Sequence, residues 1–158
     1  MSEKRLRCLL LAAGLGKRLR PITNKIPKCL VEINNEPLLG RWLRTINKLG
    51  CESVLINTHY LAPKVDKYLK NINFNNMEIN VTFEEELLGT AGTLISNIDF
   101  FKDSTVMLIH ADNVTTTDLS FLLKGHYSRS SDALITMLTF NTDKPSNCGI
   151  VETDLEGM

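Results

Sequence analysis

Short apolar runs alternate with amphipathic segments along most of this chain, and this alternation limits the folds open to it. Five runs have about the length of one β-strand, and most of them are apolar on both faces. They are residues 7–13, 53–58, 78–84, 105–111 and 133–140. Strands of this kind need cover on both sides of their sheet.

The segments between these runs have helical patterns. Residues 37–50 begin with Pro37 at the expected first helical position, carry an apolar stripe on one face and stop at Gly50. Further helices are predicted at residues 62–72, 89–98 and 117–129. Thr117 or Asp118 is the expected cap of the last one. The order strand, helix, strand predicts an α/β fold in which helices cover a mainly parallel, twisted sheet on both faces.

A parallel sheet would bring distant loops together, because ligands of such sheets bind beyond the carboxyl ends of the strands. The loops that follow the first four runs are residues 14–28, 57–62, 84–90 and 111–117. We expect these loops to share one rim. The length of 158 residues, without repeats or linkers, predicts a single domain over residues 1–158 with a real core.

The composition limits the kinds of partner and the cellular compartment that are expected for this protein. Eighteen basic residues balance eighteen acidic ones, so no global field favours nucleic acid or an anionic membrane. The first apolar run is only about seven residues long, which fits a buried strand better than a signal peptide, and no stretch approaches the ~20 apolar residues of a membrane helix. The four cysteines lack the spacing of zinc or redox motifs and are expected to be reduced thiols. These features predict a cytoplasmic protein.

The loop after the first run, residues 14–28, is called the basic loop below. Gly14 and Gly16 can turn the backbone tightly and bring bare amides against an anion, so a phosphate is the expected guest. Leu19 stands where a dinucleotide fingerprint needs its third glycine, and no Gly-Lys-Ser/Thr ending marks a P-loop. From charge alone, a solvated surface arm is an equally weighted alternative.

The rest of the basic loop supplies cations on a stiffened backbone. Pro21 and Pro27 keep the segment from forming an ordinary helix. Arg18 can grip phosphate oxygens with two parallel hydrogen bonds, whereas Lys28 is a mobile point charge that can follow developing negative charge.

These motifs resemble those of a known family, the sugar-phosphate nucleotidylyltransferases, also called nucleoside-diphosphate-sugar pyrophosphorylases. The family opens with Gly-x-Gly-x-Arg-Leu, x-Pro-Leu-Thr and Pro-Lys-Pro-Leu, and this chain has GLGKRL, RPIT and PKCL. Further agreement follows in NTHYLAPKVDKYL at 57–69, LGTAGTL at 88–94, an Asp at 112 and CGIVETDLEG at 148–157. The chain departs from the family pattern at Lys17, Cys29 and Ala111, where the family has Thr, Pro and Gly.

The resemblance implies a Rossmann-like three-layer sandwich of the nucleotidyltransferase type. It also implies an enzyme that joins a nucleoside triphosphate to a sugar 1-phosphate, giving a nucleoside-diphosphate sugar and pyrophosphate. The LGTAG form is most like mannose-1-phosphate guanylyltransferases, so GTP and a mannose 1-phosphate-like sugar are favoured. A thymidylyl-, uridylyl- or cytidylyltransferase of the same family is the alternative, and a non-catalytic nucleotide or sugar-nucleotide sensor is the rival from another class.

The resemblance also implies roles for single residues. Arg18 and Lys28 would be catalytic, and Asp112 would bind Mg²⁺, although its spacing alone favours a turn or a cap. Gly149 would approach the sugar. The implied nucleotide-binding residues are Ala12, Ala13, Gly14, Gly16, Lys17, Gly89 and Thr90.

Two other groups of polar residues receive structural interpretations. His110 falls within an apolar run and is expected to be a hydrogen-bonded core residue. A metal site is one interpretation of the run Glu84, Glu85 and Glu86. Consecutive residues of a strand point to opposite faces, however, so a solvated strand edge is expected.

Family members are longer than this chain. We therefore expect it to lack the C-terminal third of the catalytic domain, where the resemblance implies a sugar-phosphate lysine and a second metal ligand. Weak nucleotide binding and poor turnover, or none, are the expected consequences. The oligomeric state stays open, with a homo-oligomer among the alternatives.

Overall fold

The structure is a computed structural model that describes residues 5–152. It divides into two compact units, one ending at Thr116 and one beginning at Thr117, and each is described by itself. The first unit contains the parallel sheet and every predicted site residue except Gly149.

Four strands form the sheet of the first unit: β1 (Arg5–Leu11), β4 (Ser53–Thr58), β5 (Glu78–Phe83) and β6 (Ser104–His110). Their order is β5-β4-β1-β6, and every neighbouring pair is parallel. In the register, Leu9 lies beside Leu55 on one side and Leu108 on the other. The first four predicted strands are confirmed, as is the α/β fold with a Rossmann-like parallel sheet.

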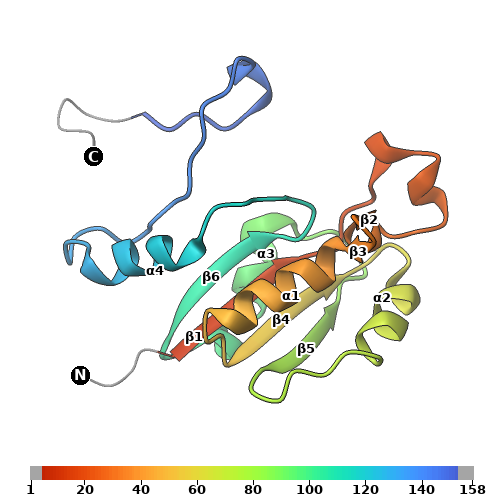
Figure 1. Cartoon of the computed structure of the whole chain (residues 1–158), viewed down its shortest axis with the longest axis horizontal. Helices are drawn as coiled ribbons and strands as arrows, with labels where there is room; N and C mark the ends of the chain where they lie inside the picture. The colour runs from red at the N-terminus through yellow and green to blue at the C-terminus, as the bar shows by residue number, and fades with distance from the viewer. Residues whose placement is uncertain (1–4, 153–158) are drawn as a thin grey trace. The chain divides into compact units, whose positions relative to one another are not determined.

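Helices cover both faces of this sheet. Figure 1 shows α1 (Leu38–Lys48) in front of the strands and α3 (Gly89–Ser96) behind them, with α2 (Ala62–Leu69) beside β5. The three predicted helices of this unit are confirmed. Pro37 is the cap residue of α1 and not its first helical residue, because its extended ψ of 139° places it just outside the helix.

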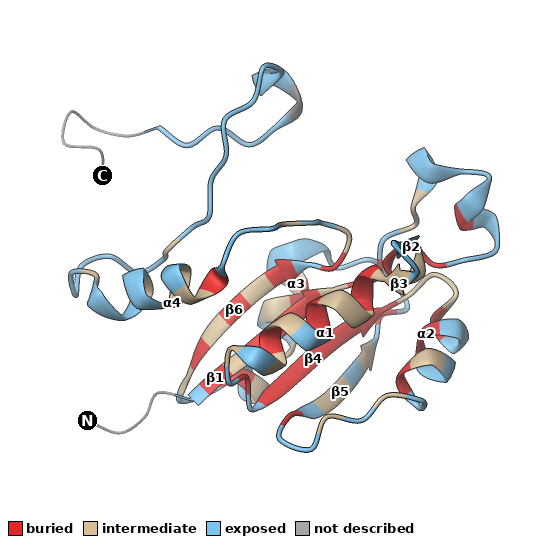
Figure 2. Ribbon diagram, in the orientation of Figure 1, coloured by how far each residue is buried: buried red, intermediate tan, exposed pale blue. Residues whose placement is uncertain are grey.

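The core lies on either side of the two central strands. All six residues of β4 are buried, and Figure 2 shows this strand as continuously buried. On one face, Leu9, Leu55 and Phe101 form a cluster that Leu94 of α3 joins. On the other face, α1 contributes a buried stripe. Four of its residues were predicted, namely Leu39, Trp42, Leu43 and Ile46; Leu38 joins them, whereas the predicted Leu49 is only partly buried.

A short hairpin that the sequence pattern did not predict leads into α1. Strands β2 (Glu32–Ile33) and β3 (Glu36–Pro37) pair antiparallel across Asn34 and Asn35. Both asparagines have positive φ, 53° and 60°, which a two-residue hairpin turn of the I′ type requires. The first unit also has 3-10 turns at Lys17–Leu19, Ile22–Asn24, Lys28–Leu30 and Ile98–Phe101.

The second unit contains α4 (Leu119–Ser128) and a 3-10 turn at Pro145–Asn147. Asp118 caps α4 by accepting a hydrogen bond from the Ser120 amide at 2.9 Å, as predicted. The predicted strand at 133–140 is wrong: no strand forms there, and Leu134, Ile135 and Phe140 are more than three-quarters exposed. A strand needs a neighbour for its backbone hydrogen bonds, and none of the described residues pairs with this segment. Across residues 5–152, no helix is long and apolar enough to cross a membrane.

Candidate active site

The basic loop follows β1 and folds back on itself through Gly16. Gly16 has φ 63°, and a Cβ added there would lie 2.8 Å from Cγ2 of Thr23. The Thr23 hydroxyl is buried against this turn and donates to the Gly16 carbonyl at 2.8 Å. Glycine is therefore required at position 16 both by conformation and by space. Between its two prolines the loop forms one short 3-10 turn and no α-helix, as expected.

The cations of the basic loop differ in exposure. Lys17 and Arg18 lie in the first 3-10 turn and are exposed. Lys28 lies in the third turn, and its side chain is only 21% exposed because it forms an ion pair with Asp112. The loop is also held from α2, since Lys64 donates to the Lys25 carbonyl. These contacts attach the basic loop to Asp112 and to α2, whereas most of residues 17–26 are exposed.

Asp112 lies directly beyond the carboxyl end of β6. The Ala111 amide continues the strand ladder by donating to the Leu11 carbonyl at 3.1 Å, and the indole of Trp42 donates to the Asn113 carbonyl at 2.9 Å. Hydrogen bonds to β1 and to α1 therefore hold the backbone on either side of Asp112. Its side chain is 32% exposed and forms an ion pair with Lys28, which lies 84 residues earlier in the sequence.

A buried polar cluster joins the other strand ends. We call Asn57, Glu84 and Thr93 the Asn57 network; the three residues are 4%, 5% and 0% exposed. Asn57 Oδ1 accepts hydrogen bonds from the amides of Ala12 at 2.6 Å and Ala13 at 3.3 Å. The amides of these two predicted nucleotide-binding residues are therefore already bonded within the protein. Among the described residues, the amides of Gly14 and Gly16 have no such partner.

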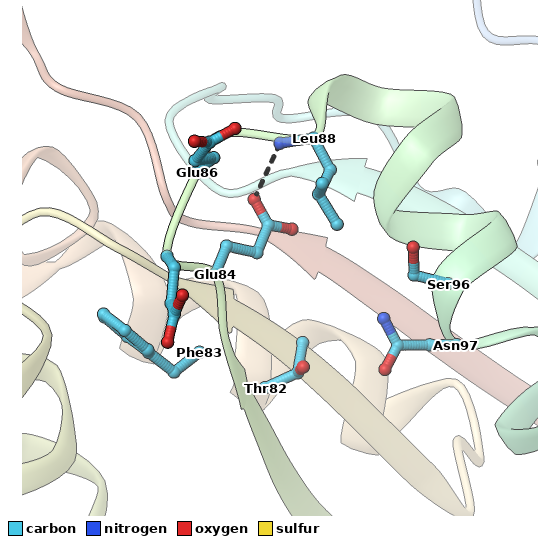
Figure 3. A pocket seen from close by; sticks show the side chains of 8 residues that line it. Thr82, Phe83, Glu84, Glu86, Leu88, Ser96 and Asn97 are labelled. Carbon is cyan, nitrogen blue, oxygen red and sulfur yellow. Dashed lines mark hydrogen bonds between the residues drawn. The ribbon is translucent and has the colours of Figure 1, made fainter.

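The expectation of a solvated edge is wrong for Glu84 and confirmed for Glu85 and Glu86, which are exposed. Glu84 turns inward because the end of β5 lies beside Asn57, whose Nδ2 donates to Glu84 Oε1 at 3.0 Å. Figure 3 shows its other oxygen directed at the Leu88 amide, which donates at 3.2 Å. The three glutamates and Leu88 are among the residues that line a cavity of about 320 Å³ at the end of β5.

The segment LGTAGTL forms the start of α3, as predicted. Gly89 has φ 71°, and nothing lies within 4 Å of the position that a Cβ would take. Gly89 and Thr90 are exposed, one residue beyond the amide that Glu84 holds. The Asn57 network thus links this helix start to the beginning of the basic loop.

Two predicted residues lie apart from this cluster. Gly149 belongs to the second unit, where it is exposed. His110 is also exposed, so the expectation of a core histidine is wrong. The reason is its position: burial alternates along β6, and His110 is the last residue of that strand, on the exposed side of the pattern.

Cys29, which follows Lys28, is buried and lies beneath the basic loop. Burial raises the pKa of its thiol to about 12, with a further increase from the charge of Asp112. All four cysteines are free thiols, as expected, and Cys148 is the exposed one.

Sequence reasoning missed Asn57, Thr23 and Trp42 as residues that hold the site. One signal was available for Asn57: a polar side chain ends an otherwise apolar strand at the rim where ligands are expected. Thr23 stands in the RPIT motif, but the motif does not reveal its contact with Gly16.

Comparisons with known proteins identify the family of this chain. A family model described as nucleotidyl transferase matches residues 7–158. The D-glycero-alpha-D-manno-heptose 1-phosphate guanylyltransferase of Aneurinibacillus thermoaerophilus is 30% identical over 82% of this chain and 56% of its own length. The UTP–glucose-1-phosphate uridylyltransferase of Synechocystis sp. is 29% identical over 96% of this chain and 42% of its own length.

Among solved structures, HddC from Yersinia pseudotuberculosis complexed with GMP-PN is 25% identical, with a TM-score of 0.66 over 77% of this chain and 54% of that chain. This chain therefore spans about half the length of these relatives, or less. Since the family model covers nearly all of it, including every residue of the site, the chain belongs to the nucleotidyl transferase family.

Proposed function

We propose that this chain carries the nucleotide-binding site of an enzyme that transfers a nucleotidyl group from a nucleoside triphosphate to a sugar 1-phosphate. The observation that carries this proposal is the meeting of Lys28 with Asp112 at the rim, beside the free amides of Gly14 and Gly16. A cation, a carboxylate and bare amides at the ends of parallel strands suit a polyphosphate. The family membership supports the same reaction class.

In this reaction an oxygen of the sugar phosphate attacks the α-phosphorus, the new O–P bond forms in line, and the bond to pyrophosphate breaks. The attacking oxygen is already anionic at neutral pH, so no general base is needed. The obstacle is the repulsion between two polyanions, and catalysis consists of positioning and charge stabilisation. We assign Arg18 to the triphosphate and Lys28 to the reacting phosphates.

The remaining residues line the nucleotide. We assign the amides of Gly14 and Gly16, with Lys17, to the phosphates, and Gly89 with Thr90 to the base and ribose. Ala12 and Ala13 would contribute through their small size and their fixed backbone, because their amides are bonded to Asn57. Gly149 is assigned to the sugar on the resemblance of its motif alone.

We propose Asp112 as a ligand of a divalent cation, with Mg²⁺ as the candidate. No group of three or more ligating side chains gathers among residues 5–152, but Mg²⁺ is often held by one or two carboxylates together with substrate phosphates and water. A single carboxylate that is about one-third exposed beside the proposed phosphate site fits that pattern. When bound, the cation would neutralise phosphate charge and polarise a phosphoryl oxygen.

GTP and a mannose- or heptose-like sugar 1-phosphate are the favoured substrates. The guanylyltransferase relative and the GMP-PN complex of HddC support this choice. UTP with glucose 1-phosphate is the second candidate, because the Synechocystis relative is named for that pair. The four free thiols support a reducing compartment such as the cytoplasm.

A pyrophosphate-release assay tests the proposal. The chain is incubated with Mg²⁺ and each common nucleoside triphosphate, crossed with several sugar 1-phosphates. Any pair that releases pyrophosphate above background identifies the substrates, and we expect Lys28→Ala and Asp112→Ala to lower that rate about 100-fold.

Lys48→Ala and Asp66→Ala are matched controls, since both side chains are exposed on helices and neither belongs to the site. Unchanged rates in these controls would tie the losses to the site. Full rates in both Lys28→Ala and Asp112→Ala would show that the chemistry has been assigned to the wrong residues. If the chain released pyrophosphate with none of the pairs and also bound none of the nucleoside triphosphates, the proposal would be rejected.

A further inference from the structure

The Asn57 network places a carboxylate and two polar side chains among buried atoms at the rim. Burying a carboxylate is unfavourable unless several donors satisfy it. The proposed reaction assigns no role to Asn57, Glu84 or Thr93, although they lie between the proposed phosphate and base sites. Their hydrogen bonds indicate what they do.

Asn57 makes the full set of hydrogen bonds that its amide allows. Its oxygen accepts from the two backbone amides of Ala12 and Ala13, and its nitrogen donates to Glu84 Oε1 at 3.0 Å and to Thr93 Oγ1 at 3.2 Å. The opposite orientation would place an NH₂ group against two N–H donors. The amide orientation is therefore fixed by its neighbours.

Glu84 and Thr93 hold Asn57 in turn. The Thr93 hydroxyl donates to Glu84 Oε1 at 2.5 Å, and Glu84 Oε2 accepts from the Leu88 amide at 3.2 Å. A chain of hydrogen bonds thus runs from the Leu88 amide, just before Gly89, to the amides of Ala12 and Ala13, just before Gly14. Networks of this kind are rigid when every member is satisfied.

We infer that Asn57 is a positioning residue that aligns the start of the basic loop with the start of α3, so that the proposed phosphate site and the proposed base site keep one geometry. The inference about the nucleotide rests on the proposed function. The inference about the backbone does not, and the two parts have separate measurements.

The direction of the hydrogen bonds allows a reversal test. Asn57→Asp keeps an acceptor for Ala12 and Ala13 but replaces the donor that faces Glu84 with a second carboxylate oxygen. Glu84→Gln in the same chain supplies a donor in the opposite direction, from residue 84 to residue 57. The double variant therefore restores a satisfied network with its polarity reversed.

Amide hydrogen exchange followed by NMR measures the backbone part. In Asn57→Asp, exchange at Ala12 and Ala13 should speed up about tenfold, as expected for the loss of one hydrogen-bonding constraint, while the central amides of β1 and β4 keep their protection. The double variant should return both amides to within about threefold of the original. Glu85→Gln is the matched control, because Glu85 is exposed beside the network and should change neither amide.

Titration with GTP and Mg²⁺ measures the nucleotide part. Affinity should fall about tenfold in Asn57→Asp and recover to within about threefold in the double variant. If Asn57→Asp fails to fold, Thr93→Val with Thr93→Ser as its conservative partner replaces it. The valine variant should lose affinity and amide protection, and the serine variant should keep both.

Uniform loss of protection across β1 and β4, or a double variant no better than the two singles, would overturn the positioning role. Selective loss at Ala12 and Ala13 with unchanged GTP affinity would overturn its link to the nucleotide. If the original chain binds neither GTP nor UTP, the proposed function fails, and amide exchange alone still decides whether Asn57 holds the loop.

Discussion

Of the two glycines of the basic loop, Gly16 has less room for a side chain. Its φ of 63° is disfavoured for residues with a side chain, and its missing Cβ would meet Thr23 at 2.8 Å and Lys28 at 3.3 Å. Gly16→Ala should therefore lower the free energy of unfolding by about 2 kcal/mol and weaken nucleotide binding by displacing Lys28. Urea denaturation followed by Trp42 fluorescence measures the first effect.

Gly14→Ala is the matched control for stability. Its φ is not in the left-handed region, and nothing lies within 4 Å of the added Cβ. The free energy of unfolding should change by less than about 0.5 kcal/mol. Equal losses in the two variants would contradict the account of Gly16.

Cys29 offers a prediction about reactivity. A thiol of pKa about 12 is ionised to roughly one part in ten thousand at pH 8, and only the thiolate reacts. Because Cys29 is also buried, iodoacetamide at pH 8 should modify Cys148 and leave Cys29 intact, as mass spectrometry can show. Modification should reach Cys29 once the protein is denatured. Equal modification of Cys29 and Cys148 in the native protein would contradict its burial.

Residue types alone were enough to suggest the basic loop as a candidate site, but not to predict the burial of Glu84. The glycines and cations of the basic loop are recognisable because few other residues have their conformational freedom or their charge. Glu84 was misread because its neighbours Glu85 and Glu86 suggested one solvated run, and only the packing of β5 against β4 turns it inward. Side-chain partners from distant strands cannot be read from local sequence.

At the level of elements, the apolar runs of the first unit predicted their strands to within two residues at each end. They succeeded because each strand pairs with a neighbour and is covered by a helix. Residues 133–140 have the same apolar character but no pairing partner among the described residues. The prediction of a strand there, which depended on apolar character alone, therefore failed. The β2–β3 hairpin was missed because its strands are only two residues long and carry no alternation.

The cap of α4 gives a pH prediction for an element. The hydrogen bond from the Ser120 amide lowers the pKa of Asp118, so the ionised carboxylate is favoured in the capped helix. The stabilisation is present above the ordinary Asp pKa and is lost as the pH falls through the lowered one. NMR titration of the Asp118 carboxyl carbon should give a pKa below the ordinary value.

The Asp118→Asn variant is the control for this cap. Asparagine keeps a capping oxygen but does not titrate, so the Ser120 amide shift should no longer follow pH in the acid range. An unshifted pKa for Asp118 would show that the cap hydrogen bond does not favour the ionised form.

Considered as a whole, the first unit gathers its polar chemistry at one rim because all four of its strands run in parallel. Residues from the ends of β1, β4, β5 and β6 meet there through the Asn57 network and the Lys28–Asp112 pair. We propose that this rim binds the triphosphate of a nucleotide between the amides and the cations of the basic loop.

The most direct test is an NMR titration of the full chain with GTP and Mg²⁺. We expect the largest amide shifts on residues 14–18, on Lys28 and on Gly89 with Thr90. We also expect the Arg18→Ala substitution to reduce these shifts. Largest shifts outside the rim, or an unchanged titration in Arg18→Ala, would contradict the claim.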